Sequence, residues 1–189
     1  MRNYQRAPED IRDDRDHSLR ISLPHRRESV RLKTWAPAQR GETHTPEFAG
    51  VALPSSTGST ADGAVHILCL APGEWLAVFD AGDVLEEHLR VWNQTRAAGG
   101  VAAVTVSDAS VVIRIQGPQS RAVLSRGCGL DFHPTSFKPA TCARTLFAKS
   151  TLIVDCVGPE CFDLYLGRSY QAYLHAWLTD AALSAALER

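Results

Sequence analysis

The sequence predicts an α+β fold in which sheets are backed by helices, and two observations predict it. Short apolar runs occur in pairs on either side of turns that contain glycine and proline, which is typical of adjacent strands. After each of the two clearest pairs, apolar residues recur three and four positions apart, which is typical of a helix that packs on a sheet. Strand pairs that alternate with single helices therefore favour sheets covered by helices.

The first strand pair is predicted at residues 64–70 (AVHILCL) and 74–79 (EWLAVF), with Ala71-Pro72-Gly73 as the turn. A helix is predicted to follow, because Asp83 can cap it and Glu86 completes a capping box three residues later. The apolar face of this helix comprises Leu85, His88, Leu89 and Trp92.

The second half begins with two predicted strands, residues 101–106 (VAAVTV) and 110–116 (SVVIRIQ). They flank Ser107-Asp108-Ala109, and we expect them to form a hairpin. A further strand pair is predicted at residues 151–157 (TLIVDCV) and 161–166 (CFDLYL), which are separated by a Gly-Pro-Glu turn.

The last predicted element is a helix that Ser169 can cap. We expect its aromatic residues to fix the chain's own core rather than to contact a partner. Its apolar stripe comprises Tyr170, Tyr173, Leu174, Trp177, Leu178, Ala181 and Ala185.

Two segments of the chain resemble each other. Residues 70–92 and 157–177 share a Gly/Pro turn, a glutamate, an apolar strand and a helix that reaches a tryptophan. The period is about half of the chain. This pattern predicts a single α+β domain over residues 26–189, made of two repeats at about 30–98 and 101–186.

The N-terminal arm, residues 1–25, differs from the remainder in composition. Its first twenty residues carry five arginines and five acidic residues and almost no large aliphatic side chain. Such a segment cannot bury enough apolar surface to offset the entropy of ordering. Two interpretations stay open: a solvated tail, and an arm that becomes ordered on the surface of a partner.

Composition and charge exclude several classes of function. The 189 residues are 44% hydrophobic and 22% charged, which is ordinary for a globular protein. The formal net charge of −1 provides no broad basic field for nucleic acid, and no apolar run approaches membrane-spanning length. With no apolar signal segment and no framework spacing among the five cysteines, we expect a cytoplasmic protein with neither a nucleic-acid nor a membrane partner.

The turn at Gly117-Pro118 raises the question of a phosphate site, because it joins a strand to a predicted helix. The proline would occupy the first helical position and removes one N–H, and neither a Walker pattern nor G-x-G-x-x-G is present. We therefore interpret the turn as a connection only, and Arg121 and Arg126 as exposed charges.

Two further candidate sites use cysteine and histidine. Cys128 or Cys142 with His133 could form a nucleophile and base, although a cysteine in an apolar surround is more often an inert core thiol. Cys142, Cys156, Cys161 and His133 could supply four zinc ligands, but no C-x2-C pair is present and structural thiols are favoured. His25 and His44 are interpreted as surface residues.

The second half contains the most specific motifs: GCGLDFHPTSF (127–137), CARTLFAK (142–149) and RSYQAYLHAW (168–177). With LAPGEWLAVF (70–79) from the first half, they resemble the gamma subunit of heterotetrameric sarcosine oxidase. The resemblance covers roughly residues 64–182.

The resemblance implies a fold akin to the internally duplicated aminomethyltransferase, or glycine-cleavage T-protein, domain. It implies a non-catalytic subunit of a flavoenzyme that oxidatively demethylates sarcosine or a related N-methyl amine, with formaldehyde or methylenetetrahydrofolate and hydrogen peroxide as products. FAD, FMN, NAD and tetrahydrofolate are then expected in partner subunits: a large and a medium flavin-carrying subunit, and a small zinc-type subunit. No catalytic, cofactor-binding or metal-binding residue is expected in this chain. Two alternatives stay open: a stand-alone folate-binding or methyltransferase-like protein of the same fold, and the small subunit of an N-methylglutamate dehydrogenase-type complex.

Overall fold

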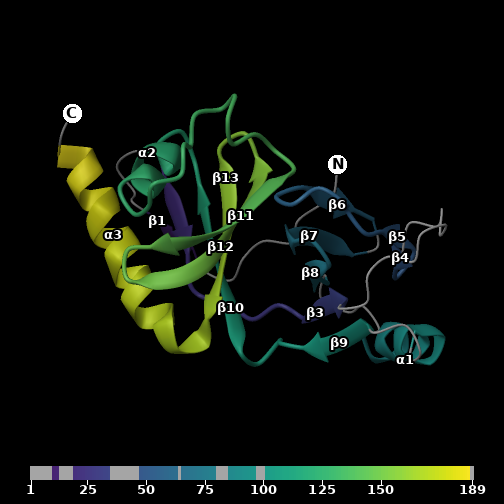
Figure 1. Cartoon of the computed structure of the whole chain (residues 1–189). Helices are drawn as coiled ribbons and strands as arrows, with labels where there is room; N and C mark the ends of the chain where they lie inside the picture. Colours follow the sequence, from purple (N-terminus) through teal and green to yellow (C-terminus); the bar gives the residue numbers. More distant parts are fainter. Residues whose placement is uncertain are drawn as a thin grey trace. The chain divides into compact units, whose positions relative to one another are not determined.

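The chain forms antiparallel sheets with few helices (Figure 1), so the predicted α+β class is confirmed. The computed structural model describes residues 10–12, 19–34, 47–63, 65–79, 85–96 and 101–187. Asp83, His44 and most of the predicted arm lie outside these residues. The backbone divides into two compact units: unit 1 comprises Met1–Arg26 and Asp108–Arg189, and unit 2 comprises Arg27–Ser107.

Unit 1 contains a six-stranded sheet whose one face is covered by helices, and Figure 1 shows the last of these helices, α3, lying along the sheet. Leucine, isoleucine, valine and phenylalanine side chains from alternate strand positions form the core between the two layers. In spatial order the strands are β1 (Asp10–Arg12), β2 (Arg20–Ser22), β10 (Ser110–Gln116), β13 (Cys161–Gly167), β12 (Ser150–Gly158) and β11 (Thr141–Phe147). The helical elements are α2 (Ser120–Ser125), the short 3-10 helix η1 (Arg168–Tyr170) and α3 (Gln171–Leu187).

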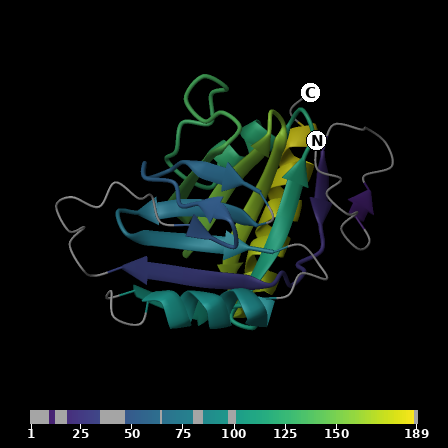
Figure 2. The same cartoon turned by 90° about the vertical axis from the view of Figure 1, so that its right-hand side faces the viewer.

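Unit 2 contains a five-stranded sheet with one helix, α1 (Leu85–Arg96), which Figure 2 shows alongside the sheet. The strand order is β6 (Thr60–Asp62), β7 (His66–Ala71), β8 (Glu74–Val78), β3 (Ser29–Thr34) and β9 (Val101–Thr105), and β4 (Glu47–Phe48) and β5 (Val51–Ala52) form a separate pair. Trp92 is buried, its ring 5.2 Å from that of Phe48, and His88 stacks on Phe79 at 5.8 Å. The predicted apolar face of α1 is therefore confirmed.

The two predicted strand–turn–strand segments are hairpins, β7–β8 in unit 2 and β12–β13 in unit 1. Each hairpin has an irregular register just before its turn, between Cys69 and Ala71 in one and between Cys156 and Gly158 in the other. In both hairpins the cysteine thiol lies within hydrogen-bonding distance of the carbonyl oxygen two residues further on. The two turns thus share a local geometry as well as a sequence pattern.

The strand beside each hairpin also corresponds. β3 pairs with β8 in unit 2, and β10 pairs with β13 in unit 1. At the end of each strand a backbone N–H donates to a carbonyl oxygen of the hairpin turn: Thr34 N–H to Gly73 O at 2.8 Å, and Gly117 N–H to Glu160 O at 2.8 Å. The two units therefore repeat the same three-strand arrangement.

The prediction that residues 101–116 form a hairpin is wrong. β9 pairs with β3 in one sheet, whereas β10 pairs with β2 and β13 in the other. The reason is burial: Ala103 of β9 packs on the core of unit 2, whereas Ile113 and Ile115 of β10 belong to the core of unit 1. Pairing within a core outweighs pairing between neighbours in sequence.

The apolar stripe of α3 is only partly buried. Leu174 and Leu178 are fully buried, and the Trp177 ring packs edge-on against Phe147 at 5.0 Å. Tyr170 and Tyr173 remain 48% and 38% exposed, so the expectation that they fix the core is wrong for both. Ser169 does not cap α3, because it lies inside the 3-10 turn η1 that precedes the helix.

Gly127 provides a stability test of unit 1. A Cβ atom there would overlap the ring of Phe147, which is fully buried. We expect Gly127→Ala to lower the free energy of unfolding by about 2 kcal/mol through overpacking. A Cβ atom at Gly129 meets nothing within 4 Å, so Gly129→Ala is the matched control and should change stability by less than about 0.5 kcal/mol. Urea denaturation of both variants tests this, and equal midpoints would contradict the close approach.

Candidate functional site

The turn after β10 is closed by its own backbone. Gly117 has a φ of +125°, which lies in the region that favours glycine, and the N–H of Ser120 donates to its carbonyl oxygen at 2.9 Å. Pro118 lies in this turn rather than at the first helical position, because α2 begins two residues later. The N–H of Gly117 is bound to Glu160 O and Pro118 has none. Both features support the interpretation of the turn as a connection.

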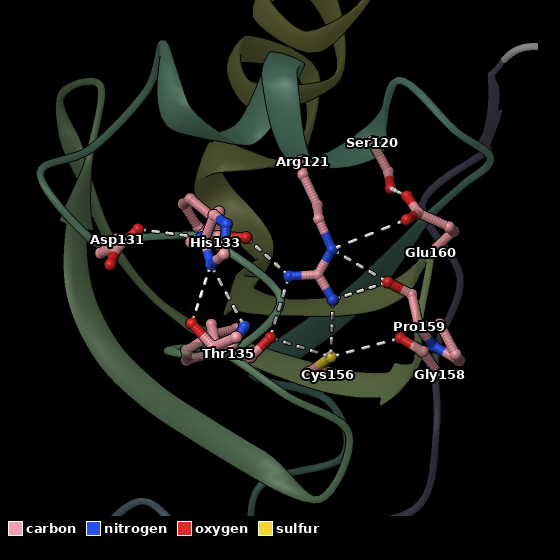
Figure 3. A network of polar contacts seen from close by, with 11 residues as sticks. Ser120, Arg121, Asp131, His133, Thr135, Cys156, Gly158, Pro159 and Glu160 are labelled. Atoms are coloured by element: carbon pink, nitrogen blue, oxygen red, sulfur yellow. Dashed lines mark hydrogen bonds and ion pairs between the residues drawn. The ribbon is translucent and has the colours of Figure 1, made fainter.

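Arg121 is the centre of the polar network in Figure 3, and the expectation that it is an exposed charge is wrong. Its side chain is only 11% exposed. One terminal nitrogen donates to Phe132 O at 2.7 Å and Phe137 O at 2.9 Å, and Nε donates to Pro159 O at 3.0 Å. The other terminal nitrogen donates to Pro159 O at 2.6 Å and lies 3.9 Å from the Cys156 sulfur.

An arginine side chain has five N–H donors, and these contacts engage all five. The guanidinium therefore has no donor left for a phosphate or a carboxylate ligand. It instead ties α2 to two other segments: the loop of residues 127–140 and the β12–β13 turn. These contacts therefore stabilise the fold of unit 1.

The aromatic residues beneath Arg121 explain why the loop of residues 127–140 is ordered. Phe132 and Phe137 are buried, and both rings pack against Phe162 of β13, at 6.0 and 6.4 Å. The Arg121 guanidinium lies 5.0 Å from the centre of the Phe162 ring, within range of a cation–π contact. Glu160 adds an ion pair to Arg121 at 3.8 Å at the solvent side of the network.

The outer part of the same loop is a separate polar turn. His133 Nδ1 lies 2.8 Å from the hydroxyl oxygen of Thr135, and Asp131 accepts the His133 N–H at 2.9 Å. A hydrogen bond from the Ser136 side chain, together with this N–H, holds the pKa of the Asp131 carboxyl below its usual value. These contacts fix the loop and leave His133 at the surface.

A buried ion pair lies on the other face of the six-stranded sheet. Arg114 of β10 and Asp163 of β13 are directly opposite, and two N–H···O bonds of 2.6 Å join them. The Asp163 side chain is 1% exposed and the Arg114 side chain 17%. Burial alone would lower the pKa of Arg114, but the hydrogen bonds and the charge of Asp163 outweigh it and raise that pKa.

Comparison with known proteins gives the family. A model of the sarcosine oxidase, gamma subunit family matches residues 36–184. The chain belongs to the sarcosine oxidase gamma subunit family. Sarcosine oxidase subunit gamma from Corynebacterium sp. strain U-96 is 25% identical over 150 residues, which are 77% of this chain and 70% of that protein. The same subunit from strain P-1 is 28% identical over 151 residues, 77% of this chain and 71% of that protein.

Two solved structures resemble this member of the gamma subunit family. A chain of the heterotetrameric sarcosine oxidase from Corynebacterium sp. U-96, in complex with pyrrole 2-carboxylate, superposes with a TM-score of 0.76 at 21% identity, over 86% of this chain and 83% of that one. The glycine cleavage system aminomethyltransferase T from Bartonella henselae superposes with a TM-score of 0.55 at 14% identity. That match covers 85% of this chain and 45% of the aminomethyltransferase, so the expected likeness to the T-protein fold is confirmed.

The candidate nucleophiles and the candidate base have separate environments in this gamma-subunit fold. His133 bonds Thr135 at the surface, whereas Cys142 is buried in β11 opposite Asp155. Cys128 is half-buried against the core of unit 1. Burial of this kind favours an inert thiol.

The candidate zinc ligands do not all lie on one face of the sheet, in agreement with the favoured interpretation as structural thiols. Cys142 is opposite Asp155 and therefore lies on the same face as that residue, so Cys156, next in sequence, lies on the other face. Cys156 is opposite Phe162 and shares its face. Cys161 precedes Phe162 in the strand, so it lies on the opposite face, together with Cys142. Within the described residues, no three His, Cys, Asp or Glu side chains gather as a metal ion requires.

The remaining sequence expectations concern single residues and membrane spans. Arg126 is exposed as predicted. His25 is half-buried rather than at the surface, because its backbone forms an isolated bridge with Val112. Among the described helices, none is long and apolar enough to cross a membrane.

Burial of Cys161 predicts a pH dependence of stability. Burial raises the pKa of this thiol from 9.0 to about 11, so unfolding releases a proton between these values. Stability is therefore unaffected below about pH 9 and falls as the pH rises, by up to about 1.4 kcal/mol per pH unit. The variant Cys161→Ala should lose this contribution, so its stability relative to wild type should rise by at least about 1 kcal/mol between pH 8 and pH 10.5. Urea denaturation across this range tests the prediction, and a constant difference would contradict it.

Proposed function

We propose that the chain is a non-catalytic gamma subunit of a heterotetrameric sarcosine oxidase-type flavoenzyme. Membership of the gamma subunit family carries the proposal, because the family model spans residues 36–184 of this chain. The enzyme would oxidatively demethylate sarcosine or a related N-methyl amine, and would release formaldehyde or methylenetetrahydrofolate and hydrogen peroxide. FAD, FMN, NAD and tetrahydrofolate would lie in a large, a medium and a small zinc-type subunit, in a reducing cytoplasm.

The non-catalytic role is supported by the contacts of Arg121 and by the burial of two thiols in unit 1. All five donors of Arg121 are engaged by the protein itself. Burial raises the pKa values of Cys156 and Cys161, which keeps both thiols protonated and poorly nucleophilic near neutral pH. These groups serve the fold, so the contribution of the chain to the enzyme would be a surface on which other subunits assemble.

We also infer that the fold arose by duplication of one unit. Three strands, the irregular register before the hairpin turn and the backbone bond that closes it correspond between the units. In each half, the strand that precedes the three-strand unit joins the other sheet: β2 precedes β3 but pairs with β10, and β9 precedes β10 but pairs with β3. Duplication of one unit, followed by exchange of the preceding strand between the two copies, accounts for the shared three-strand arrangement and for the pairing of β2 and β9.

Co-expression tests the proposed function. The full chain would be produced alone and together with candidate flavin-carrying subunits, and absorption spectra, masses and sarcosine turnover would be recorded. We expect a colourless chain without turnover when it is alone, and a yellow, active assembly of higher mass with its partners. Flavin or amine turnover in the lone chain would overturn the non-catalytic role, and failure to join any flavin-carrying subunit would overturn the assignment as a subunit.

The likeness to aminomethyltransferase T supports one alternative, a stand-alone folate-binding or methyltransferase-like protein. Titration of the lone chain with tetrahydrofolate separates the two functions, because only the alternative requires a folate site here. Saturable folate binding by the lone chain would favour the alternative. If N-methylglutamate rather than sarcosine is oxidised by the assembled complex, the chain is instead the small subunit of an N-methylglutamate dehydrogenase-type enzyme.

A further inference from the structure

We propose that the outer face of α3 docks against a helix of a partner subunit, and that this partner helix carries a lysine or arginine that pairs with Asp180. The inference rests on the proposed role as a subunit and specifies which surface is used. It comes from a comparison of the two long helices of the chain, α1 and α3.

α3 is apolar on two opposite sides. One stripe, which includes Leu174 and Leu178, is buried against the sheet of unit 1. The outer stripe, defined as Tyr173, Ala176, Asp180 and Leu183, is exposed, and Leu183 is 56% accessible. A helix that is hydrophobic all round is normally buried on all sides. The sheet covers only one side of α3, so its outer stripe indicates a second contact.

The helix of unit 2 shows what a solvent-facing helix of this chain looks like. The exposed residues of α1 include Glu86, Glu87 and Arg90, and the last two form an ion pair. α3 contains no lysine or arginine in its 17 residues, and Asp180 is its one acidic residue. Both helices follow the second strand of corresponding hairpins, so their positions in the fold do not explain why α1 has a charged outer face and α3 an apolar one. A partner that covers the outer face of α3 explains this difference.

The shape of the outer stripe fits a helical partner. Its four residues are separated by three, four and three positions, so they line one side of α3, as a helix packed along α3 would require. They extend over about 15 Å of helix, or roughly three turns. The small side chain of Ala176 permits close approach, whereas Tyr173 and Leu183 provide apolar area at either end. These features fit an apolar helix better than a loop or a strand.

Asp180 identifies the charge of the partner. A carboxylate within an apolar seam is costly unless a cation pairs with it, and a single polar residue at such a position fixes register and partner choice. A second copy of α3 would bring a second Asp180 and no lysine or arginine into the seam. The seam therefore selects against self-association and for a different subunit that supplies a base.

The test uses the full chain co-expressed with its flavin-carrying subunits and compares recovery of the complex. Ala176→Arg and Leu183→Lys are expected to reduce recovery at least about tenfold, while far-UV circular dichroism and the unfolding midpoint of the isolated chain stay unchanged. Val91→Lys is the matched control, because Val91 is an exposed apolar residue of α1 at 46% accessibility. It should leave recovery unchanged.

Charge variants test the partner's base. Asp180→Lys should weaken the complex more than Asp180→Asn, and the affinity of the wild type should fall with added salt more steeply than that of Asp180→Asn. Equal recovery of wild type, Ala176→Arg and Leu183→Lys would overturn the docking surface while leaving the proposed function intact. If the isolated chain forms a dimer that Ala176→Arg abolishes, the surface is homotypic and the proposal is wrong. If the wild type joins no flavin-carrying subunit, the proposed function itself fails.

Discussion

Replacement of Arg121 by methionine is expected to lower the free energy of unfolding by about 3 kcal/mol. Three backbone carbonyl groups, those of Phe132, Phe137 and Pro159, accept hydrogen bonds from this one side chain. The Phe132 and Phe137 carbonyl groups lie in partly buried contacts, and each costs about 1 kcal/mol or more when it is left without its donor, whereas the exposed Pro159 carbonyl can be hydrated. Loss of the cation–π contact with Phe162 adds about 1 kcal/mol, and methionine restores none of these contacts. Arg121→Lys should recover only part of the loss, because one ammonium group lacks the planar, five-donor geometry that these contacts require.

Arg168→Met is the control for the removal of a charge from unit 1. Arg168 is exposed in η1, and its substitution should change stability by less than about 0.5 kcal/mol. Urea denaturation followed by circular dichroism measures all three variants. Equal stabilities of Arg121→Met and Arg168→Met would show that the Arg121 contacts do not hold the loop of residues 127–140.

The strands and helices that depend on local sequence were predictable. The hairpins β7–β8 and β12–β13 follow from apolar runs beside Gly/Pro turns, and α1 and α3 follow from apolar spacing. The pairing of β9 with β3 was not predictable in this way, because it depends on which core each strand completes. Because β9 and β10 are close in sequence, a hairpin was expected, but β9 packs on the core of unit 2 and β10 on the core of unit 1.

The site residues were less predictable than the elements. From sequence alone, Arg121 was interpreted as a surface charge. Its hydrogen-bond acceptors are carbonyl groups of residues 132, 137 and 159, and the residues next to Arg121 in sequence do not indicate them. The partners of such a residue come from the tertiary fold. The exposure of Tyr170 and Tyr173 was missed for a related reason: apolar spacing marks a helix face as fit for burial, but does not say whether this chain or another one buries it.

One signal for the ion pair is present in the sequence. Arg114 interrupts the apolar run VVIRI, and Asp163 interrupts the run FDLYL, each near the middle of its strand. Asp155 likewise interrupts LIVDCV. Charged residues are rarely buried unless they are paired, so single charges of opposite sign within neighbouring apolar strands indicate an ion pair. The strand order β10-β13-β12 then decides that Arg114 and Asp163 are the pair.

Removal of Arg114 should have the largest effect on stability in the described part of unit 1. Arg114→Met would remove both guanidinium bonds from the buried Asp163 carboxylate, which lies directly opposite a second buried carboxylate, Asp155. Breaking a buried pair in this way costs about 3–5 kcal/mol, whereas replacing both partners by apolar residues is often close to neutral.

The double variant Arg114→Met/Asp163→Leu should therefore be more stable than Arg114→Met alone, with a coupling energy of about 2 kcal/mol in a double-mutant cycle. The exposed pair of α1 is the control: Arg90→Met should leave the unfolding midpoint unchanged within error, because Glu87 and Arg90 are both solvated at about half of their side-chain surface. If Arg114→Met proves no more destabilising than Arg90→Met, the cost of the buried carboxylates is relieved by another group, and the pair does not organise this face of the sheet. If the two single substitutions are merely additive, the charges of Arg114 and Asp163 stabilise the fold independently rather than through each other.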